Sequence, residues 1–187
     1  MTFLALVISV FSVLVSMTVA WITLLRRGTL HMTQPVQIAF VFENDKPKIF
    51  LRTLLYATGK HGYVIEGLYL KILRGEVNHT FGFWSYGERN ELIVAGGLRI
   101  SEDGAAFNHH FLDINEYSNF DFLEGEYVVE TYARVANRSN PRLLSTAKLA
   151  LSATEASVLR FRRAGVLFTR QPETGIYHPS LSPPRSA

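Results

Sequence analysis

His109 and His110 are the residues whose types best suit chemistry, and Asp113 follows three positions further along. Imidazole nitrogens and a carboxylate can together bind a metal ion or transfer a proton. The surrounding segment, residues 106–112, has the pattern of a β-strand, in which adjacent side chains point to opposite faces. Because a metal site needs at least three converging ligands, we expect one histidine in the core, the other outside it, and no bound metal or cofactor.

Arg52 is a second candidate, because it interrupts the apolar run of residues 48–57. Its guanidinium group can bind an anionic headgroup or pair with Glu66 across a hairpin. An arginine on the exposed face of a strand is the more common arrangement. We keep Arg52 as a possible binding residue.

Trp84 is a third candidate, in a run that also contains Phe81, Phe83 and Tyr86. Four aromatic side chains can form a platform on which a ligand stacks. In strands, however, aromatic residues more often pack in the core or across neighbouring strands. Together with Arg52, His109 and His110, Trp84 completes the set of possible binding residues.

The sequence contains no Gly-x-Ser-x-Gly motif, no phosphate-binding glycine loop, no His-Glu-x-x-His motif and no cysteine. A thiol nucleophile, a disulfide scaffold and a cysteine metal site are therefore excluded. A hydrolase built from scattered Ser, His and Asp stays open, because catalytic triads are defined by geometry rather than by sequence order. We expect no catalytic residue and no enzyme activity.

The charge distribution indicates a membrane surface rather than nucleic acid. The net charge of +3 is mild, and acidic and basic residues are interspersed along the chain. Arg160, Arg162 and Arg163 form a small basic cluster of the kind that is usually solvated. Without a concentrated basic stripe, we expect no nucleic-acid partner.

The first 25 residues contain no charged side chain. A helix of that length extends about 37 Å, enough to cross a hydrocarbon core of about 30 Å. A cleaved signal would have a basic start and a shorter apolar core, so we expect a retained anchor. Arg26 and Arg27 follow the run, which predicts a short N-terminus outside and the larger domain inside the cell.

Small residues lie along one side of this expected helix. At 100° per residue they fall within an arc of roughly 80°. Such a stripe lets a second helix approach closely, and its hydroxyl groups can bond across the contact. The alternative is that these hydroxyl groups bond to the carbonyl one turn back. The expected helix-pairing face is Ala5, Ser9, Ser12, Ser16, Ala20 and Thr23.

Beyond the anchor, short apolar runs alternate with turn residues, which is typical of an all-β sandwich or barrel. The expected strands are residues 36–43, 48–57, 63–73, 80–86, 92–100, 106–112, 126–136, 143–151 and 164–169. A four-residue hairpin connection is expected at 87–90. Ser152 and Glu155 have the spacing of a capping box, which predicts a short helix through about Leu159.

Tyr127 follows Gly125 at the start of a long expected strand. This placement is typical of the tyrosine corner of immunoglobulin-like sandwiches, whose hydroxyl group anchors the preceding crossover. We therefore predict an immunoglobulin-like β-sandwich behind a single N-terminal transmembrane helix. The expected divisions are an anchor (1–27), a juxtamembrane linker (28–34), the sandwich (35–170) and an irregular tail with prolines (171–187).

Four segments resemble a group of uncharacterised bacterial proteins with one N-terminal span and a small β-rich domain. They are Phe50-Leu-Arg-Thr-Leu-Leu-Tyr56, Phe81-Gly-Phe-Trp-Ser-Tyr-Gly87, Asn108-His-His-Phe-Leu112 and Phe122-Leu-Glu-Gly-Glu-Tyr127. The resemblance covers nearly the whole chain and implies a place in the bacterial cell membrane. The group has no assigned activity, so the resemblance assigns no functional residue.

We expect a membrane-anchored, non-catalytic interaction module, an accessory or adaptor subunit that binds a protein partner at the membrane or a second copy through its span. The alternative is a membrane-tethered sandwich that binds a small ligand or lipid. A buried cavity with a polar rim would favour the ligand binder, whereas a flat apolar patch would favour the protein partner.

Overall fold

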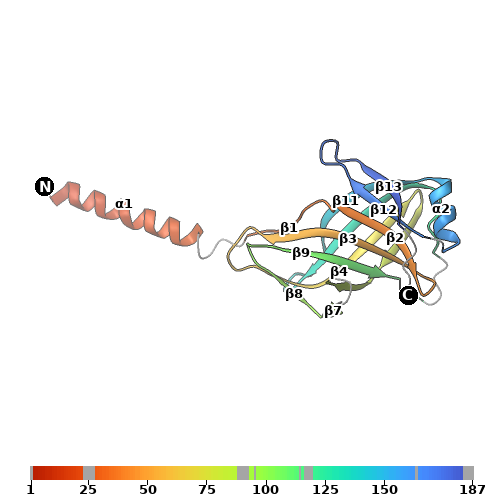
Figure 1. The fold of residues 1–187 in the computed structure, drawn as a ribbon. Coiled ribbons are helices and arrows are strands. Elements are labelled where there is room, and N and C mark those ends of the chain that lie inside the picture. The colour runs from red at the N-terminus through yellow and green to blue at the C-terminus, as the bar shows by residue number, and fades with distance from the viewer. Residues whose placement is uncertain are drawn as a thin grey trace.

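The computed structural model describes residues 2–22, 28–87, 93–94, 96–113, 115, 120–162 and 164–182. Helix α1 (Thr2–Ala20) comes first, and two β-sheets follow, with the short helix α2 (Ala153–Arg160) at the end of the sheets farthest from α1 (Figure 1). An apolar N-terminal helix followed by a mostly β domain is the class that the sequence predicts.

The larger sheet has the strand order β13-β12-β2-β3-β9-β6-β7, and β1 also pairs with β3. Its neighbouring strands are antiparallel. The bounds are β1 (Leu30–Met32), β2 (Gln37–Glu43), β3 (Lys46–Ala57), β6 (Phe83–Tyr86), β7 (Ile93–Val94), β9 (Ala105–Leu112), β12 (Gly165–Arg170) and β13 (Tyr177–Ser182).

The smaller sheet has the order β11-β10-β4-β5. Strand β8 also pairs with β4, at residues 63–65, whereas β5 pairs with residues 70–74 of the same strand. The bounds are β4 (Tyr63–Arg74), β5 (Val77–Phe81), β8 (Leu98–Ile100), β10 (Gly125–Val135) and β11 (Arg142–Leu151). Two strands therefore share one edge of β4.

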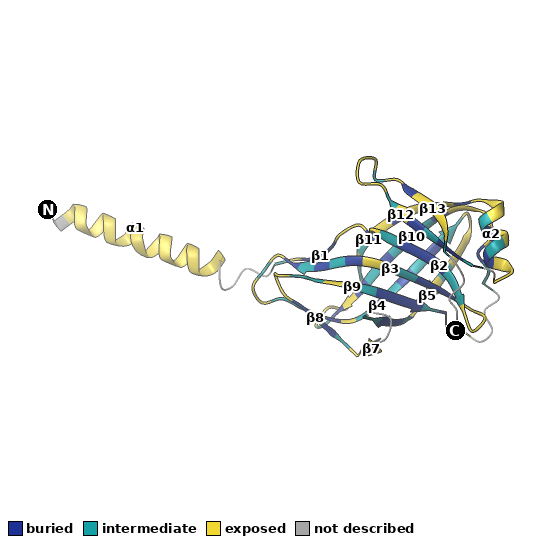
Figure 2. Cartoon of the chain, in the orientation of Figure 1, coloured by how far each residue is buried: buried dark blue, intermediate teal, exposed yellow. Residues whose placement is uncertain are grey.

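The core lies between the two sheets. Buried residues alternate with more exposed ones along β10 and β11, as a period of two requires for a sheet with one buried face (Figure 2). The larger sheet contributes Phe40, Ile49 and Phe111, each 0% exposed. Burying one such side chain stabilises the fold by about 1.5–3 kcal/mol.

Two expected strands are each divided between the sheets. Residues 80–86 form β5 and β6, which meet at Gly82 and belong to different sheets. Residues 92–100 likewise contain β7 in the larger sheet and β8 in the smaller one. β6 and β7 pair as the expected hairpin predicts, although residues 88–92 lie outside the described part. A continuous apolar run does not reveal where a strand changes sheet.

The expected linker and tail both contain strands. Within residues 28–34, β1 pairs with β3 and buries Leu30. Within residues 171–187, β13 pairs with β12, and the Tyr177 hydroxyl donates to the Pro35 carbonyl at 2.6 Å. Three residues are too few to show a period in β1. The proline in β13 misled the prediction, because Pro179 is tolerated on an edge strand, where its missing N–H costs no sheet bond.

Tyr127 anchors the crossover from β9 in the larger sheet to β10 in the smaller one. Its side chain is 0% exposed, and its hydroxyl donates to the Leu123 carbonyl at 2.5 Å. This is the bond that the sequence predicts. Burial raises the pKa of Tyr127 to about 12, so the hydroxyl stays protonated and able to donate at neutral pH.

Helix α2 begins with the predicted capping box. The Ser152 hydroxyl accepts from the Glu155 N–H at 3.3 Å, and the Glu155 carboxylate accepts from the Ser152 N–H at 2.8 Å. Two backbone donors without partners inside the helix are thereby satisfied. The helix packs Ala156 and Leu159 against the domain and ends at Arg160.

Candidate functional site

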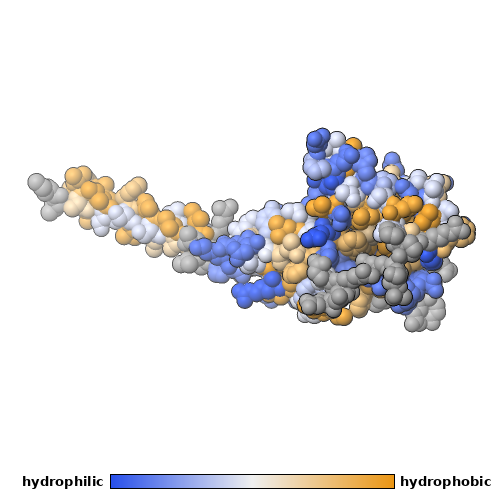
Figure 3. Space-filling model, in the orientation of Figure 1, coloured by the Kyte–Doolittle hydropathy of each residue, from blue (hydrophilic) through white to orange (hydrophobic). Residues whose placement is uncertain are grey.

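Helix α1 is long and apolar enough to cross a membrane, and none of its apolar window is buried against the domain. Figure 3 shows mostly hydrophobic side chains along its surface. Of the expected pairing face, Ala5, Ser9, Ser12, Ser16 and Ala20 lie on this helix and are exposed. Thr23 lies outside the described residues.

The hydroxyl groups of α1 bond within the helix where bonds are described. Ser12 donates to the Ile8 carbonyl at 2.9 Å, and Thr18 donates to the Leu14 carbonyl at 2.8 Å. Ser12 lies on the expected pairing face, whereas Thr18 lies off it. A contact between helices on this face would therefore depend on close packing more than on the Ser12 hydroxyl.

His109 is hydrogen-bonded to Trp84 inside the core. The Trp84 indole Nε1–H donates to His109 Nδ1 at 3.1 Å, and both side chains are buried. Burial, together with the charge of neighbouring His110, lowers the pKa of His109 to about 3. His109 is therefore a neutral imidazole whose proton is on Nε2, and that atom is buried without a hydrogen-bond partner in the described part of the chain.

His110 points to the other face of β9, as adjacent strand residues must, and it stacks on Phe50 with ring centroids 5.8 Å apart. It is only 6% exposed. The expectation that one histidine lies outside is therefore wrong. That side of the sheet is covered at this point, since Lys48 and Ser85 on the same side are buried as well.

The other predicted binding residues do not converge on one site. Arg52 is exposed on β3 of the larger sheet, while Glu66 lies on β4 of the smaller sheet, so the two do not face each other across a hairpin. Phe81 is buried on β5 and Trp84 on β6, in different sheets, so the aromatic run forms no single platform. No cluster that could hold a metal ion occurs among the described residues.

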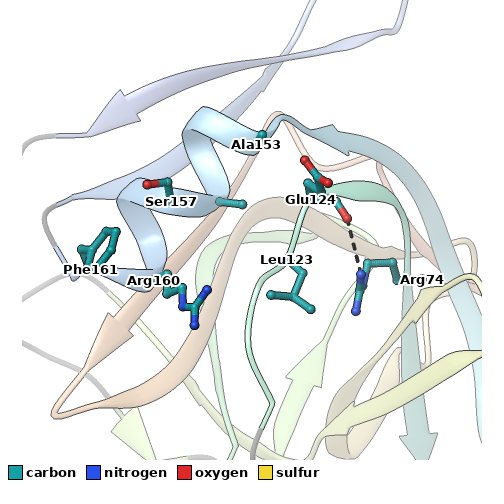
Figure 4. Close-up of a pocket in the computed structure, with 8 residues that line it drawn as sticks. Arg74, Leu123, Glu124, Ala153, Ser157, Arg160 and Phe161 are labelled. Carbon is teal, nitrogen blue, oxygen red and sulfur yellow. Dashed lines mark hydrogen bonds between the residues drawn. The ribbon is translucent and has the colours of Figure 1, made fainter.

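A pocket of about 470 Å³ lies at the α2 end of the domain (Figure 4). Three segments meet there: the end of β4, the crossover before β10 and helix α2. The lining residues are Arg74, Leu123, Glu124, Ala153, Ala156, Ser157, Arg160 and Phe161. We call this the far-end pocket.

The far-end pocket combines two cations with exposed apolar surface. Leu123 is 41% exposed and Phe161 is 63% exposed, so both large apolar side chains of the lining are open to solvent. Figure 4 shows Leu123 between the guanidinium groups of Arg160 and Arg74. Arg74 donates from Nη1 to the Glu124 carbonyl at 3.4 Å, and its guanidinium lies over the Tyr127 ring at 6.0 Å.

The arginines of the predicted basic cluster differ in their contacts. Arg162 lies over the Phe42 ring at 3.3 Å and approaches Asp45 and Asp121 at 3.7 and 3.8 Å, so its charge is used within the fold. The exposed guanidinium group of Arg160 has no hydrogen-bond or ion-pair partner in the described part of the chain. Arg163 lies outside the described residues.

The opposite end of the domain receives the chain from α1. The Tyr63 hydroxyl donates to the Gly28 carbonyl. The Thr29 N–H donates to Thr58 Oγ1 at 2.7 Å, and the Thr58 N–H donates to the Thr29 carbonyl at 2.9 Å. Tyr63 begins β4, and Arg74 ends it in the far-end pocket. Twelve strand residues extend roughly 36 Å, so the pocket lies about that far from the entry of α1 (Figure 1).

The outward face of the smaller sheet carries an ordered patch of polar and aromatic side chains. Tyr69 and Tyr132 stack with centroids 5.2 Å apart, and the Lys71 ammonium lies 5.2 Å above the Tyr132 ring. The Tyr132 hydroxyl donates to the Glu130 carboxylate at 2.9 Å. These contacts among Tyr69, Lys71, Tyr132 and Glu130 use part of the binding capacity of the patch.

The far-end pocket was not predicted as a unit, although its parts have sequence signals. The capping box located α2, and the tyrosine corner located the crossover that carries Leu123. Arg74 stands at a strand end before Gly75, whose φ of 57° marks a turn. Nothing in the spacing of these segments indicates that they meet.

Comparisons with known proteins give a distant likeness to a solved structure. No protein-family model matches the chain, and no curated protein matches it. Among solved structures it is similar to the CooA pilin subunit from enterotoxigenic Escherichia coli, with 9% sequence identity and a TM-score of 0.34 over 66% of this chain and 99% of that one. We therefore infer function from the chain's own geometry.

Proposed function

We propose that this chain is a single-pass, membrane-anchored and non-catalytic interaction module that binds a protein partner through the far-end pocket. One observation carries the proposal: strand β4 begins at Tyr63, which contacts Gly28 where the chain arrives from α1, and it ends at Arg74 in the pocket. A span at one end and an open pocket at the other would display the pocket to proteins beside the membrane. An accessory or adaptor subunit needs this arrangement.

The proposed location is the bacterial cell membrane, with α1 as the span and the β domain in the cytoplasm. The length and apolar composition of α1 support a span, and equally allow a signal sequence. Arg26 and Arg27 support the cytoplasmic placement through the positive-inside rule. The small-residue face of α1 would then contact a second copy or the span of a partner.

We also propose that the domain is related to immunoglobulin-like sandwiches. In those folds strands A-B-E-D form one sheet and C-F-G the other. Here β2-β3-β9-β6 and β5-β4-β10-β11 follow the same order if β2 is taken as strand A and β4 as strand C. Tyr127 then stands at the start of strand F, where the tyrosine corner belongs. The β12–β13 hairpin would be an addition beside strand A.

The exposure of the far-end pocket favours a protein partner over an enclosed small ligand. Small-molecule sites usually surround most of the ligand's surface. Leu123 and Phe161 are instead open to solvent, so this pocket suits a side chain or short segment presented by another protein. The volume of about 470 Å³ lies in the range of small-ligand pockets, which keeps the tethered ligand or lipid binder as the second candidate.

Site-specific photocrosslinking in native membranes tests the proposal. A photoreactive amino acid at exposed Ser157, in the pocket, should give a discrete protein adduct. The matched control is Thr146, exposed on the outward side of β11. The adduct should be lost in Leu123→Asp, which places a charge on the apolar floor. An equal adduct from Thr146, or none from Ser157, would contradict the proposal.

A further inference from the structure

We propose that the far-end pocket recognises an acidic–apolar peptide segment. In such a segment an Asp or Glu side chain lies next to an apolar side chain the size of leucine or phenylalanine. This inference rests on the proposed function and names the chemistry of the partner. It follows from the two guanidinium groups, from the exposed Leu123 side chain between them and from the distance of the pocket from α1.

The carboxylate is assigned to Arg160. A guanidinium group presents several N–H donors in a planar fork that matches a carboxylate. Arg160 extends from the last turn of α2 into the pocket without a partner in the described chain, so its donors are available. Arg74 adds a second positive charge on the other side of Leu123, while one of its donors is used by the Glu124 carbonyl.

The apolar group is assigned to Leu123, and Phe161 is a second exposed apolar side chain of the lining. Both are more than 40% exposed, and Ala153 and Ala156 add small apolar side chains to the lining. Removing these side chains from water favours a complex, against the costs of association. A purely anionic ligand would leave that apolar surface in water.

The one acidic residue of the lining, Glu124, limits where the peptide carboxylate can lie. Figure 4 shows Glu124 on the side of Ala153, whereas Arg160 projects on the side of Phe161. The two carboxylates can therefore occupy different sides of the pocket. The lining carries two positive charges against one negative charge, which favours an anionic partner.

A lipid headgroup of the membrane that holds α1 is a poor occupant for geometric reasons. β4 places Arg74 roughly 36 Å from Tyr63, the residue that contacts Gly28. The attraction of anionic headgroups fades within a Debye length of about 8 Å at physiological salt. A protein segment can reach the pocket, whereas that headgroup layer cannot unless the domain lies down on the membrane.

Peptide selection on the full chain tests this inference. The chain is held in phosphatidylcholine nanodiscs and used to select from a random heptapeptide library. Enriched peptides should contain Asp or Glu next to Leu, Ile or Phe, and their labelled synthetic versions should bind with an affinity that falls as salt is raised. Arg160→Gln should weaken binding by about tenfold or more, since charge-assisted hydrogen bonds are lost.

Matched variants separate charge from fold. Arg134→Gln removes an exposed arginine from the outward face of β10 and should leave peptide binding unchanged. Arg160→Lys keeps the charge without the fork and should retain part of the affinity. Dihexanoyl phosphatidylglycerol, a soluble anionic lipid, is the lipid probe. It should displace the labelled peptide no better than a simple anion of the same charge.

Three results would overturn the inference: enriched peptides without acidic residues, binding that is indifferent to Arg160→Gln, or an Arg160-dependent site that takes the lipid probe and no peptide. The Ser157 adduct distinguishes failure here from failure of the proposed function. If the adduct persists in Arg160→Gln while no acidic peptide is enriched, the proposal of a protein partner survives and the proposed acidic–apolar chemistry of that partner is wrong. If Ser157 gives no adduct, the proposed function itself fails.

Discussion

Tyr63 and Arg74 are the first and last residues of the same strand, β4, which runs between opposite ends of the domain. The Tyr63 hydroxyl donates to the carbonyl of Gly28, where the described chain resumes after α1. The Arg74 guanidinium lines the far-end pocket. Because β4 lies between β10 and the strands β5 and β8, this connection is held by sheet hydrogen bonds along much of its length.

The tyrosine corner gives the first prediction. Tyr127→Phe removes a hydroxyl that donates to the Leu123 carbonyl from a fully buried position. It should lower the free energy of unfolding by about 1–3 kcal/mol, because the hydrogen bond that holds the crossover is lost and the Leu123 carbonyl loses its donor. Chemical denaturation of the full chain in detergent micelles measures the change.

Tyr56→Phe is the matched control for this substitution, because the Tyr56 hydroxyl has no partner in the described part of the chain. It should leave the denaturation midpoint within experimental error. An unchanged midpoint in Tyr127→Phe would show that the crossover is held without that bond. Peptide binding would then be expected to survive the substitution as well.

His109 gives a prediction about pH. Its pKa is lowered to about 3 in the folded chain, chiefly by burial, from an ordinary value of 6.5. Below pH 6.5 the unfolded chain therefore binds a proton that the folded chain does not, so stability should fall as pH falls from 6.5 toward 3. The loss from this one group should approach about 1.4 kcal/mol per pH unit.

The variant His109→Gln removes the titrating group and should flatten this part of the dependence, whatever its stability at neutral pH. Denaturation midpoints at pH 7 and pH 5 give the comparison. His178→Gln, on the exposed edge strand β13, should leave the slope as it is. A slope that is equal in His109→Gln and the unmodified chain would mean that His109 can be protonated in the fold.

The histidines and the divided strands show what the sequence could and could not predict. Alternation located the strands, and it placed His109 and His110 on opposite faces correctly. It could not show that the outward face of β9 is covered, because covering depends on segments distant in sequence. For the same reason it could not show that the chain changes sheet at Gly82, where two apolar runs are continuous.

The candidate site divides in the same way. The capping box and the tyrosine corner are local patterns: the capping box was predicted with both partners, and the Tyr127 hydroxyl was predicted to anchor the preceding crossover. The far-end pocket depends on the tertiary meeting of Arg74, Leu123 and Arg160, which lie far apart in the sequence. Arg160 and Arg162 are two positions apart and equally basic, yet only the fold shows that Arg162 is paired, whereas the Arg160 guanidinium has no partner among the described residues.

The small-residue face of α1 gives a prediction about association in the membrane. Ser12→Leu with Ser16→Leu should weaken it, because the added bulk keeps two helices apart. Even hydrogen bonds between membrane helices average only about 0.6 kcal/mol each, so the loss should be moderate. Leu4→Ile with Leu14→Ile, off that face, should leave association unchanged.

A span-only reporter of self-association measures this effect, and a pulldown of the full chain covers an unlike partner. Equal behaviour of the two double variants in both assays would mean that the small residues gather on one side by chance. α1 would then be an anchor without a pairing role.

The flanking arginines give a prediction about orientation. A reporter fused after Ala187 should be cytoplasmic in bacterial cells, because Arg26 and Arg27 resist transfer across the membrane. Replacing both with glutamine while adding lysines after Met1 should increase the inverted fraction. Periplasmic activity of the unmodified fusion would reverse the orientation, and release of a soluble, shortened domain would show a cleaved signal in place of an anchor.

The central claim is that α1 holds one end of the sandwich at the membrane, so that the far-end pocket lies away from the membrane. Depth-dependent fluorescence quenching tests this most directly. The full chain is placed in bilayers containing headgroup-labelled quencher lipids, with a single fluorophore at Lys60 or at Ser157. Lys60 lies in the turn beside Thr58, at the entry of α1, and Ser157 lines the pocket. The account predicts strong quenching at Lys60 and little at Ser157, whereas equal quenching at both positions would contradict it.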